Sequence, residues 1–418
     1  MTLHPILSAL RKHKAGVVLI ALQIALTLAI VCNAIFIIGQ RIERANRPTG
    51  LNENGLFLIS QQWVGAPSGD DPAGVEKLDA LQLEDLAALR NLPDVASVAP
   101  TNSVPLWNSS WNGSLSLKPG QQMGSDVGTN TGYYFTDEQG LTTLGLRLVA
   151  GRAFTAADVQ HQSNQGQHGR PLVIVTRALA DKLFPQGDAV GKVIYSDGSN
   201  APSTIIGVVA RLQSSASGSW TSGFELYSTL VPARLDSNYS RYAVRAKPGR
   251  LQAAMRAVTP ALYKMNPLRV LDDESVTSFT DIRAKAYRAD VGMAILMGVI
   301  CLILLAVTAA GIVGLTSFWV GQRQRQIGVR RALGARKVDI LRYFQIENLL
   351  IAGAGVVIGV LLALGLNLWL MTQYEMTRMP VAYVLTGVLA MLAIGQAAVF
   401  VPARRASNVP PVVATRAV

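Results

Sequence analysis

Four long apolar runs interrupt an otherwise mixed sequence of 418 residues. No charged residue occurs in 15–39, 291–320, 348–374 or 381–402. An α-helix rises about 1.5 Å per residue, so about 20 apolar residues cross the roughly 30 Å hydrocarbon layer of a membrane. The pattern predicts four transmembrane helices, at residues 15–39, 291–320, 346–371 and 381–402, with a short outer loop at 372–380.

The stretch between the first two runs, residues 40–290, has a different pattern. Short segments of alternating apolar and polar positions, typical of strands, are separated by turn residues and by helical periodicities. About 250 residues can bury a core of their own. We therefore predict an α-helical membrane protein with four transmembrane helices plus a large α+β extracytoplasmic domain, periplasmic in a double-membrane cell, inserted between helices 1 and 2.

Two β-α-β sets stand apart within this domain. The first comprises strands at 55–63 and 95–98 around a helix at 81–91. The second comprises strands at 203–210, 225–231, 242–245 and 268–271 with a helix at 251–265. Sets separated in this way indicate one α+β unit interrupted by an insertion. The predicted parts are an α+β subdomain of residues 50–114 and 202–272, an inserted β-rich subdomain of 115–201, and stalks at 40–48 and 273–290.

A basic segment, residues 321–345, lies between the second and third apolar runs. It carries seven Arg and Lys residues against one acid, Asp339, so the positive-inside rule puts it in the cytoplasm. Gln322–Leu333 is rich in Arg and Gln and contains no proline, and Gly334 is suited to a left-handed stop. We expect a helix, a stop and then the next span.

Helical spacing gives this segment two faces. Arg323, Gln326 and Arg330 share one face by their i, i+3, i+7 spacing. Val329, Ala332 and Leu333 form a small apolar face elsewhere. A short amphipathic helix at the cytoplasmic end of a transmembrane helix is suited to docking a partner protein. The alternative is a basic cluster that only orients the protein and contacts lipid phosphates.

The net charge of +12, from 38 basic and 26 acidic residues, has the same origin. The three predicted cytoplasmic pieces, residues 1–14, 321–345 and 403–418, hold 13 basic residues and one acidic residue. The remainder therefore holds 25 of each sign. The excess indicates membrane topology, with both termini in the cytoplasm, and not a nucleic-acid surface.

The sequence RQIGVRRALGARKVDILRYF within this segment resembles the cytoplasmic coupling segment of the MacB/FtsX-type ABC transporter permeases. The phrases at Thr136–Asp158 and Pro171–Ile194 and the tail Val401–Pro411 resemble the same family, whose usual Glu is replaced here by Gln326. In that family the segment seats in an ATP-binding subunit. The resemblance carries over to Arg325, Ile327, Gly328, Arg330, Leu333, Gly334 and Ala335, with Gln326 in the place of the Glu. Together with Arg323 and Arg331 of the same basic segment, these are the predicted docking residues.

Small residues recur every fourth position in two of the predicted spans. They are Ala306, Ala310 and Gly314 in the second span and Gly355, Gly359 and Ala363 in the third. This spacing lets helix backbones approach closely, so we predict packing faces within the bundle or between subunits. In the first span, Gln23, Thr27 and Asn33 are expected to form interhelical hydrogen bonds.

Three candidate chemistries are weak. The loop Gly187–Lys192 has three residues between its glycines where a nucleotide-binding loop has four, so we predict a turn. His161 and His168 have no cysteine or patterned carboxylate nearby, so no metal site is predicted. Cys32 and Cys301 lie in apolar runs, so no disulfide framework is expected.

The resemblance implies a permease subunit that is not itself an enzyme and holds no cofactor, with ATP and Mg²⁺ bound by a separate ATPase. It further implies a second permease, identical or related, in the bacterial inner membrane, and a possible periplasmic adaptor and outer-membrane duct. Export from the periplasm is the expected function. Activation of a cell-wall hydrolase and release of lipoproteins are the alternatives, and the sequence leaves the cargo, the ATPase and the choice of homodimer or heterodimer open.

Overall fold

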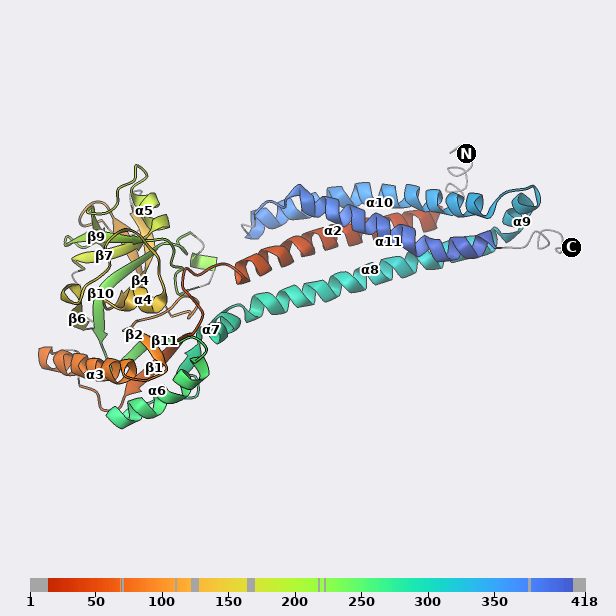
Figure 1. The fold of residues 1–418 in the computed structure, drawn as a ribbon. Coiled ribbons are helices and arrows are strands. Elements are labelled where there is room, and N and C mark those ends of the chain that lie inside the picture. The colour runs from red at the N-terminus through yellow and green to blue at the C-terminus, as the bar shows by residue number, and fades with distance from the viewer. Residues whose placement is uncertain are drawn as a thin grey trace. The chain divides into compact units, whose positions relative to one another are not determined.

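The computed structural model describes residues 14–408 apart from 68, 70, 110, 122–127, 164–169, 217–218, 222 and 375–376. The chain divides into two compact units (Figure 1). The α+β unit comprises Arg47–Arg288, and the helical unit comprises the residues on either side of it in the sequence.

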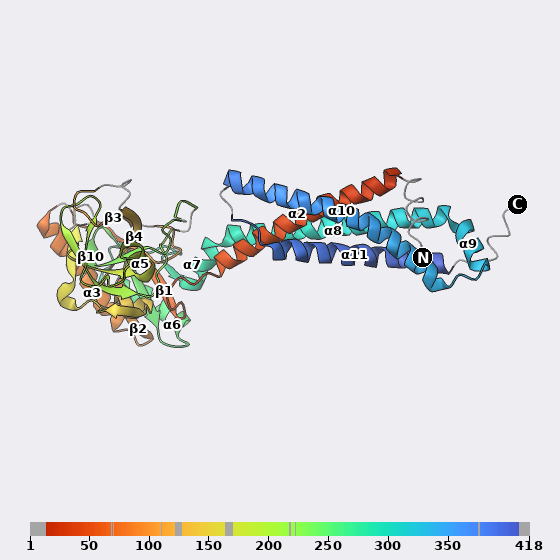
Figure 2. The same cartoon turned by 90° about the horizontal axis from the view of Figure 1, so that it is seen from above.

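The helical unit contains four long helices, which run along a common direction in both views (Figures 1 and 2). They are α2 (Lys14–Ala45), α8 (Arg288–Gln322), α10 (Lys337–Tyr374) and α11 (Val381–Ser407), with the short helix α9 (Gln324–Ala332) between α8 and α10. Each long helix is apolar enough to cross a membrane. The four predicted spans all lie inside these helices, which extend beyond them. In particular, α11 continues past residue 402, through Arg404 and Arg405, into the predicted tail.

Helix α10 packs closely on α2 through the predicted stripe of small residues. A Cβ built at Gly359 would lie 2.9 Å from the backbone oxygen of Ala25, and one at Gly355 would lie 2.7 Å from that of Ala21. Ala363 is fully buried. The three small residues therefore form a packing face within this chain.

Helix α8 packs less extensively. Its small-residue stripe is exposed, and no described atom lies within 4 Å of a Cβ built at Gly314. The side chains that α8 buries are on another face, including Thr308, Ile312 and Trp319. Among the described residues, the stripe of Ala306, Ala310 and Gly314 thus has no packing role, and its use between subunits stays a prediction.

The three polar residues of α2 form the interhelical hydrogen bonds that the sequence predicted. Gln23 donates to the carbonyl of Val307 at 3.2 Å, and the hydroxyls of Thr27 and Thr308 are 2.8 Å apart. Asn33 donates to the carbonyl of Ala363 on α10 at 3.1 Å. These polar groups link α2 to α8 and to α10.

A five-stranded antiparallel sheet forms one part of the α+β unit. Its order is β12 (Arg269–Val270), β1 (Leu56–Trp63), β11 (Tyr239–Ala246) and β2 (Val95–Pro100), and β13 (Val276–Ser278) also pairs with β1. Helices α3 (Pro72–Arg90) and α6 (Leu251–Met265) cover the sheet and share its apolar core. Helix α3 begins nine residues before the predicted helix because Asp71 caps it and Pro72 suits its first turn.

An eight-stranded sheet forms the other part. Its order is β4 (Gly128–Thr136), β3 (Trp111–Ser116), β8 (Val193–Ser196), β9 (Pro202–Val209), β7 (Leu172–Thr176), β10 (Ser228–Asp236) and β6 (Gln160–Ser163), with β5 (Leu148–Gly151) paired to β9. Because β10 also pairs with β4, the sheet closes into a barrel. The short helices α4 (Gly140–Leu144) and α5 (Arg177–Leu183) and the 3₁₀ turns η1 (Ala156–Asp158) and η2 (Ser219–Thr221) complete this part.

The predicted boundary between the two subdomains is wrong. Strands β9 and β10, which we assigned to the residue 202–272 half, belong to the barrel, and the barrel already begins at β3. The chain returns to the five-stranded sheet only between β10 and β11. A strand's own pattern of apolar positions does not specify its partner, so the sequence could not assign these two strands.

The predicted stalks are also only partly helical. The first is simply the end of α2, which continues to Ala45. The second, residues 273–290, begins with strand β13 and becomes helical at α7 (Phe279–Ala286), whose N-cap is Ser278.

Candidate functional site

Helix α9 and the turn that follows it form the basic segment. The helix stops at the expected place, since Gly334 has φ +95°. Its N–H donates to the carbonyl of Arg331 at 3.1 Å, and the N–H of Ala335 donates to that of Arg330 at 3.0 Å. This pair of bonds is a Schellman motif, which gives the helix–stop–helix order a defined geometry.

The polar face of this segment turns toward α10. Arg323 donates to both carboxylate oxygens of Glu347 at 3.0 Å, and the two side chains are only 11% and 3% exposed. The Arg330 guanidinium lies over the Tyr343 ring, 5.1 Å from its centroid. The guanidinium groups of Arg323 and Arg330 therefore interact with side chains of α10 and are less available to a partner protein.

Two further contacts fix α9 against its neighbours. Ile327 and Gly328 are buried, and Ile327 belongs to the core of the helical unit. Arg331 donates to the carbonyl of Ser407 at the end of α11. Helix α9 is thus attached to both α10 and α11.

The apolar face of α9 turns outward. Leu333 is 84% exposed, Val329 is 44% exposed, and Val338 at the start of α10 is 58% exposed. Arg325, Arg336 and Lys337 are exposed cations of the same segment. We call this group, Val329, Leu333 and Val338 with those three cations, the exposed patch.

The structure divides the ten predicted docking residues into two groups. Exposed are Arg325, Gln326, Arg330, Leu333 and Gly334; buried or partly buried are Arg323, Ile327, Gly328, Arg331 and Ala335. The Arg323–Glu347 pair was missed, although Glu347 is the one acid at the start of the third predicted span. The pair could have been predicted, because Glu347 lies beside one apolar run and Arg323 follows the preceding one, and an acid near the membrane needs a partner.

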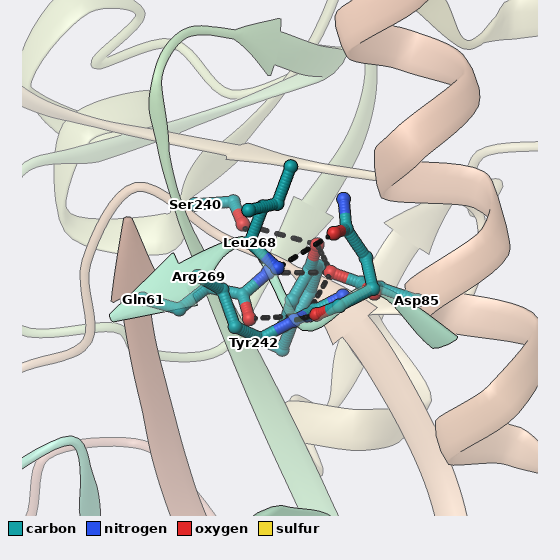
Figure 3. Close-up of polar contacts among 7 residues, drawn as sticks. Gln61, Asp85, Ser240, Tyr242, Leu268 and Arg269 are labelled. Atoms are coloured by element: carbon teal, nitrogen blue, oxygen red, sulfur yellow. Dashed lines mark hydrogen bonds and ion pairs between the residues drawn. The ribbon is translucent and has the colours of Figure 1, made fainter. Parts of the chain in front are cut away.

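A fully buried ion pair lies in the core of the five-stranded sheet (Figure 3). Arg269 of β12 donates to both oxygens of Asp85 on α3, at 2.9 and 3.0 Å, and both side chains are 1% exposed. Gln61, Ser240 and Tyr242 complete the hydrogen bonds around the pair. Because every charged atom of this pair has a partner, the cluster stabilises the packing of α3 against strand β12.

A second polar cluster lies one and a half turns earlier on α3, where this helix meets the barrel. Asp79 pairs with Arg234 of β10, and Asp236 of the same strand lies 3.3 Å from Nδ1 of His161 on β6. Burial, followed by the charge of Asp79, raises the pKa of Asp236 to about 7. His168, the other predicted candidate, lies outside the described residues.

The loop at Gly187–Lys192 is a turn, as predicted. Gly187, Asp188 and Gly191 all have positive φ, and the chain proceeds into strand β8 where a phosphate-binding loop would start a helix.

Comparison with known proteins gives two family matches. The MacB-like periplasmic core domain matches residues 18–261, and the FtsX-like permease C-terminal domain matches residues 298–411. Together they cover most of the helical unit and most of the α+β unit.

Individual curated relatives are MacB proteins, in agreement with the family matches. A macrolide export ATP-binding/permease protein MacB of Paracoccus denitrificans is 29% identical over 414 residues, which are 97% of this chain and 57% of that protein. The MacB of Chromobacterium violaceum is 29% identical over 64% of this chain and 40% of its own length. This chain therefore spans about half the length of such relatives.

The periplasmic region of MacB from Actinobacillus actinomycetemcomitans, a solved structure, aligns over 56% of this chain and 94% of that one. The identity is 16% and the TM-score 0.34. This chain belongs to the MacB/FtsX-type permeases of ABC transporters.

Proposed function

We propose that this chain is the permease subunit of an ABC exporter and transmits ATP-driven motion to an extracytoplasmic domain. An ATP-binding subunit, which carries the ATP and Mg²⁺, docks on the exposed patch. The observation that carries the proposal is the 84% exposure of Leu333 on a helix that is itself fixed by Arg323–Glu347 and Arg331–Ser407. An exposed apolar side chain on a fixed helix, in a segment with exposed cations, is suited to packing against a partner protein.

In this proposal α8 is the moving element. It contacts α2 through a few polar pairs, including the 2.6 Å pair of Arg41 and Asp290, and through Leu315 and Trp319 near Gly16, and most of its apolar surface is exposed. The small-residue packing of α10 on α2 keeps those two helices fixed. Closure of the ATP-binding subunits would therefore shift α9, together with the attached α10 and α11, relative to α8, and the α+β unit, which precedes α8 in the sequence, would change shape.

The distribution of charges and the family support the proposed membrane context. The chain lies in the bacterial inner membrane, with both termini and α9 in the cytoplasm and the α+β unit in the periplasm. A second permease, identical or related, completes the assembly, and the exposed stripe of α8 is available for it. A periplasmic adaptor and an outer-membrane duct are the expected partners for export.

The names of the relatives favour export over the two alternatives. Curated relatives include macrolide export proteins and a pyoverdine export ATP-binding/permease protein from Pseudomonas syringae, 27% identical over 84% of this chain. Those substrates belong to those proteins. For this chain we propose export of a small or medium-sized molecule from the periplasm.

The test compares Leu333→Glu with a matched control. The full chain is purified in detergent from its native membrane. The ATPase activity of the purified sample and the amount of ATP-binding protein that co-purifies are then measured. Leu333→Glu should lower both at least about tenfold, since it removes an apolar anchor worth about 1.5–3 kcal/mol. Leu268→Glu, at a 62% exposed leucine of the α+β unit, should lower neither.

Two outcomes count against the proposal. If Leu333→Glu kept full ATPase activity in the purified complex, the exposed patch would not be the docking surface. If the wild-type chain carried no ATP-binding protein and no ATPase activity, the permease assignment itself would fail. Arg330→Glu with Arg331→Glu should also abolish ATPase stimulation, but Arg331 holds its own chain together, so Leu333→Glu is the cleaner variant.

A further inference from the structure

The cluster at the junction of α3 with the barrel has the composition of a metal site. The ligand atoms of Asp79, His161 and Asp236 all lie within 4.8 Å of one another. They come from α3, β6 and β10, so the sequence separates them by at least 75 residues. Sequence spacing alone gave no sign of the carboxylates beside His161.

The geometry between His161 and Asp236 fits shared ligation. Their nearest atoms, Nδ1 and Oδ2, are 3.3 Å apart, which is long for a hydrogen bond to a carboxylate. Two ligand atoms that each bind a tetrahedral zinc at about 2.0–2.1 Å are themselves about 3.3 Å apart. The His161 side chain is 42% exposed, so an ion bound here would remain accessible to water.

Neighbouring side chains hold the two carboxylates in place. Arg234 donates to both oxygens of Asp79, the longer bond being 2.9 Å. Gln82 approaches Oδ1 of Asp236 at 3.4 Å, which leaves Oδ2 directed at His161. Ionised carboxylate oxygens have further lone pairs, so Asp79 can accept from Arg234 and still bind a cation.

The charge balance also favours a cation. Asp79 and Asp236 are two acids beside one permanent cation, Arg234, and the Asp236 side chain is fully buried. A buried carboxyl group ionises at little cost only where a cation lies beside it. The Asp85–Arg269 pair on the same helix, with one acid and one arginine, has no such imbalance.

We propose that His161, Asp236 and Asp79 bind a Zn²⁺ ion, which fastens α3 to the barrel edge. One imidazole and two carboxylates form a three-ligand set that zinc accepts with a water in the fourth position. Calcium and magnesium prefer six or more oxygen ligands and seldom use imidazole. The bound ion joins the two subdomains of the α+β unit at the point where β10 leaves the barrel.

A zinc titration of the full chain tests the site. The protein is purified in detergent with a tag that contains no histidine, stripped with a chelator, and titrated with Zn²⁺ by calorimetry. We expect one ion per chain, and a loss of affinity of at least about tenfold in His161→Ala. Glu84→Gln, which changes an exposed acid of α3, is the matched control and should bind as the wild type does.

A second measurement tests whether bound zinc holds α3 against the barrel. Amide exchange in α3 around Asp79 should slow when zinc is added to the wild type and not when it is added to His161→Ala. Because His161 is partly exposed, His161→Ala keeps the fold even where Asp236→Asn does not. Wild type without stoichiometric binding, or His161→Ala with unchanged zinc affinity, would overturn the proposal. Neither result depends on ATPase docking, so it leaves the proposed function untouched.

Discussion

Helices α10 and α8 are both long, apolar and adjacent to α2, yet they are attached to it differently. Helix α10 brings Gly355 and Gly359 against the α2 backbone, so a side chain at either place would collide with it. Helix α8 leaves its own small residues exposed and contacts α2 through the hydrogen bonds of Gln23 and Thr27 and through Leu315 and Trp319, which lie near Gly16. Small residues at the same spacing thus form a fixed contact in one helix and none within the chain in the other. The difference suggests which helix is fixed and which can move.

The largest expected effect is at the joint between the two helices, where Arg323 follows α8 and pairs with Glu347 of α10. Arg323→Met leaves the buried Glu347 carboxylate without its guanidinium, and we expect a loss of about 3–5 kcal/mol in stability. Thermal unfolding in detergent measures it. Arg325→Met, at an exposed arginine of the same helix, is the control. Equal stability of the two variants would mean that α8 and α10 are not joined by this pair.

Glycine substitutions test the comparison directly. Gly359→Leu forces a side chain into the α2 backbone and should destabilise the helical unit by about 1–3 kcal/mol or more. Gly314→Leu has open space in this chain and should leave the unfolding temperature of the isolated chain unchanged. If Gly314→Leu were as damaging as Gly359→Leu, α8 would be packed as tightly as α10.

The smallest effect concerns the threonine pair between α2 and α8. Thr27→Val, Thr308→Val and the double variant form a cycle whose coupling energy reports the hydrogen bond alone. We expect about 0.6 kcal/mol, as for other interhelical bonds in membranes. A coupling above about 2 kcal/mol would show that this contact locks α8 in place, contrary to the account.

Local features of the fold were predictable from the sequence. The four apolar runs, the stop at Gly334 and the helix Leu251–Met265 depend on composition and on residues near in sequence, and the structure has all of them. The hydrogen bonds of Gln23, Thr27 and Asn33 were also expected, because an isolated polar group in an apolar helix needs a partner.

Features that depend on distant partners were not predictable. The sheet to which β9 and β10 belong, and the face that α8 buries, are decided by segments far away in the chain. The ten predicted docking residues do not form one exposed surface, because Arg323 pairs with α10 and Ile327 lies in the core of the helical unit. Asp79, His161 and Asp236 are likewise brought together only by the fold.

The most direct test measures whether α8 moves while α10 and α11 stay together. Spin labels go at three equally exposed leucines, Leu302 on α8, Leu361 on α10 and Leu389 on α11, with Cys32 and Cys301 replaced by alanine. Electron–electron distances are measured in the complex with its ATP-binding subunit, without nucleotide and with ATP and vanadate. The account predicts that the Leu302–Leu361 distance changes and the Leu361–Leu389 distance does not. A Leu302–Leu361 distance that stays constant in a complex that hydrolyses ATP would contradict it.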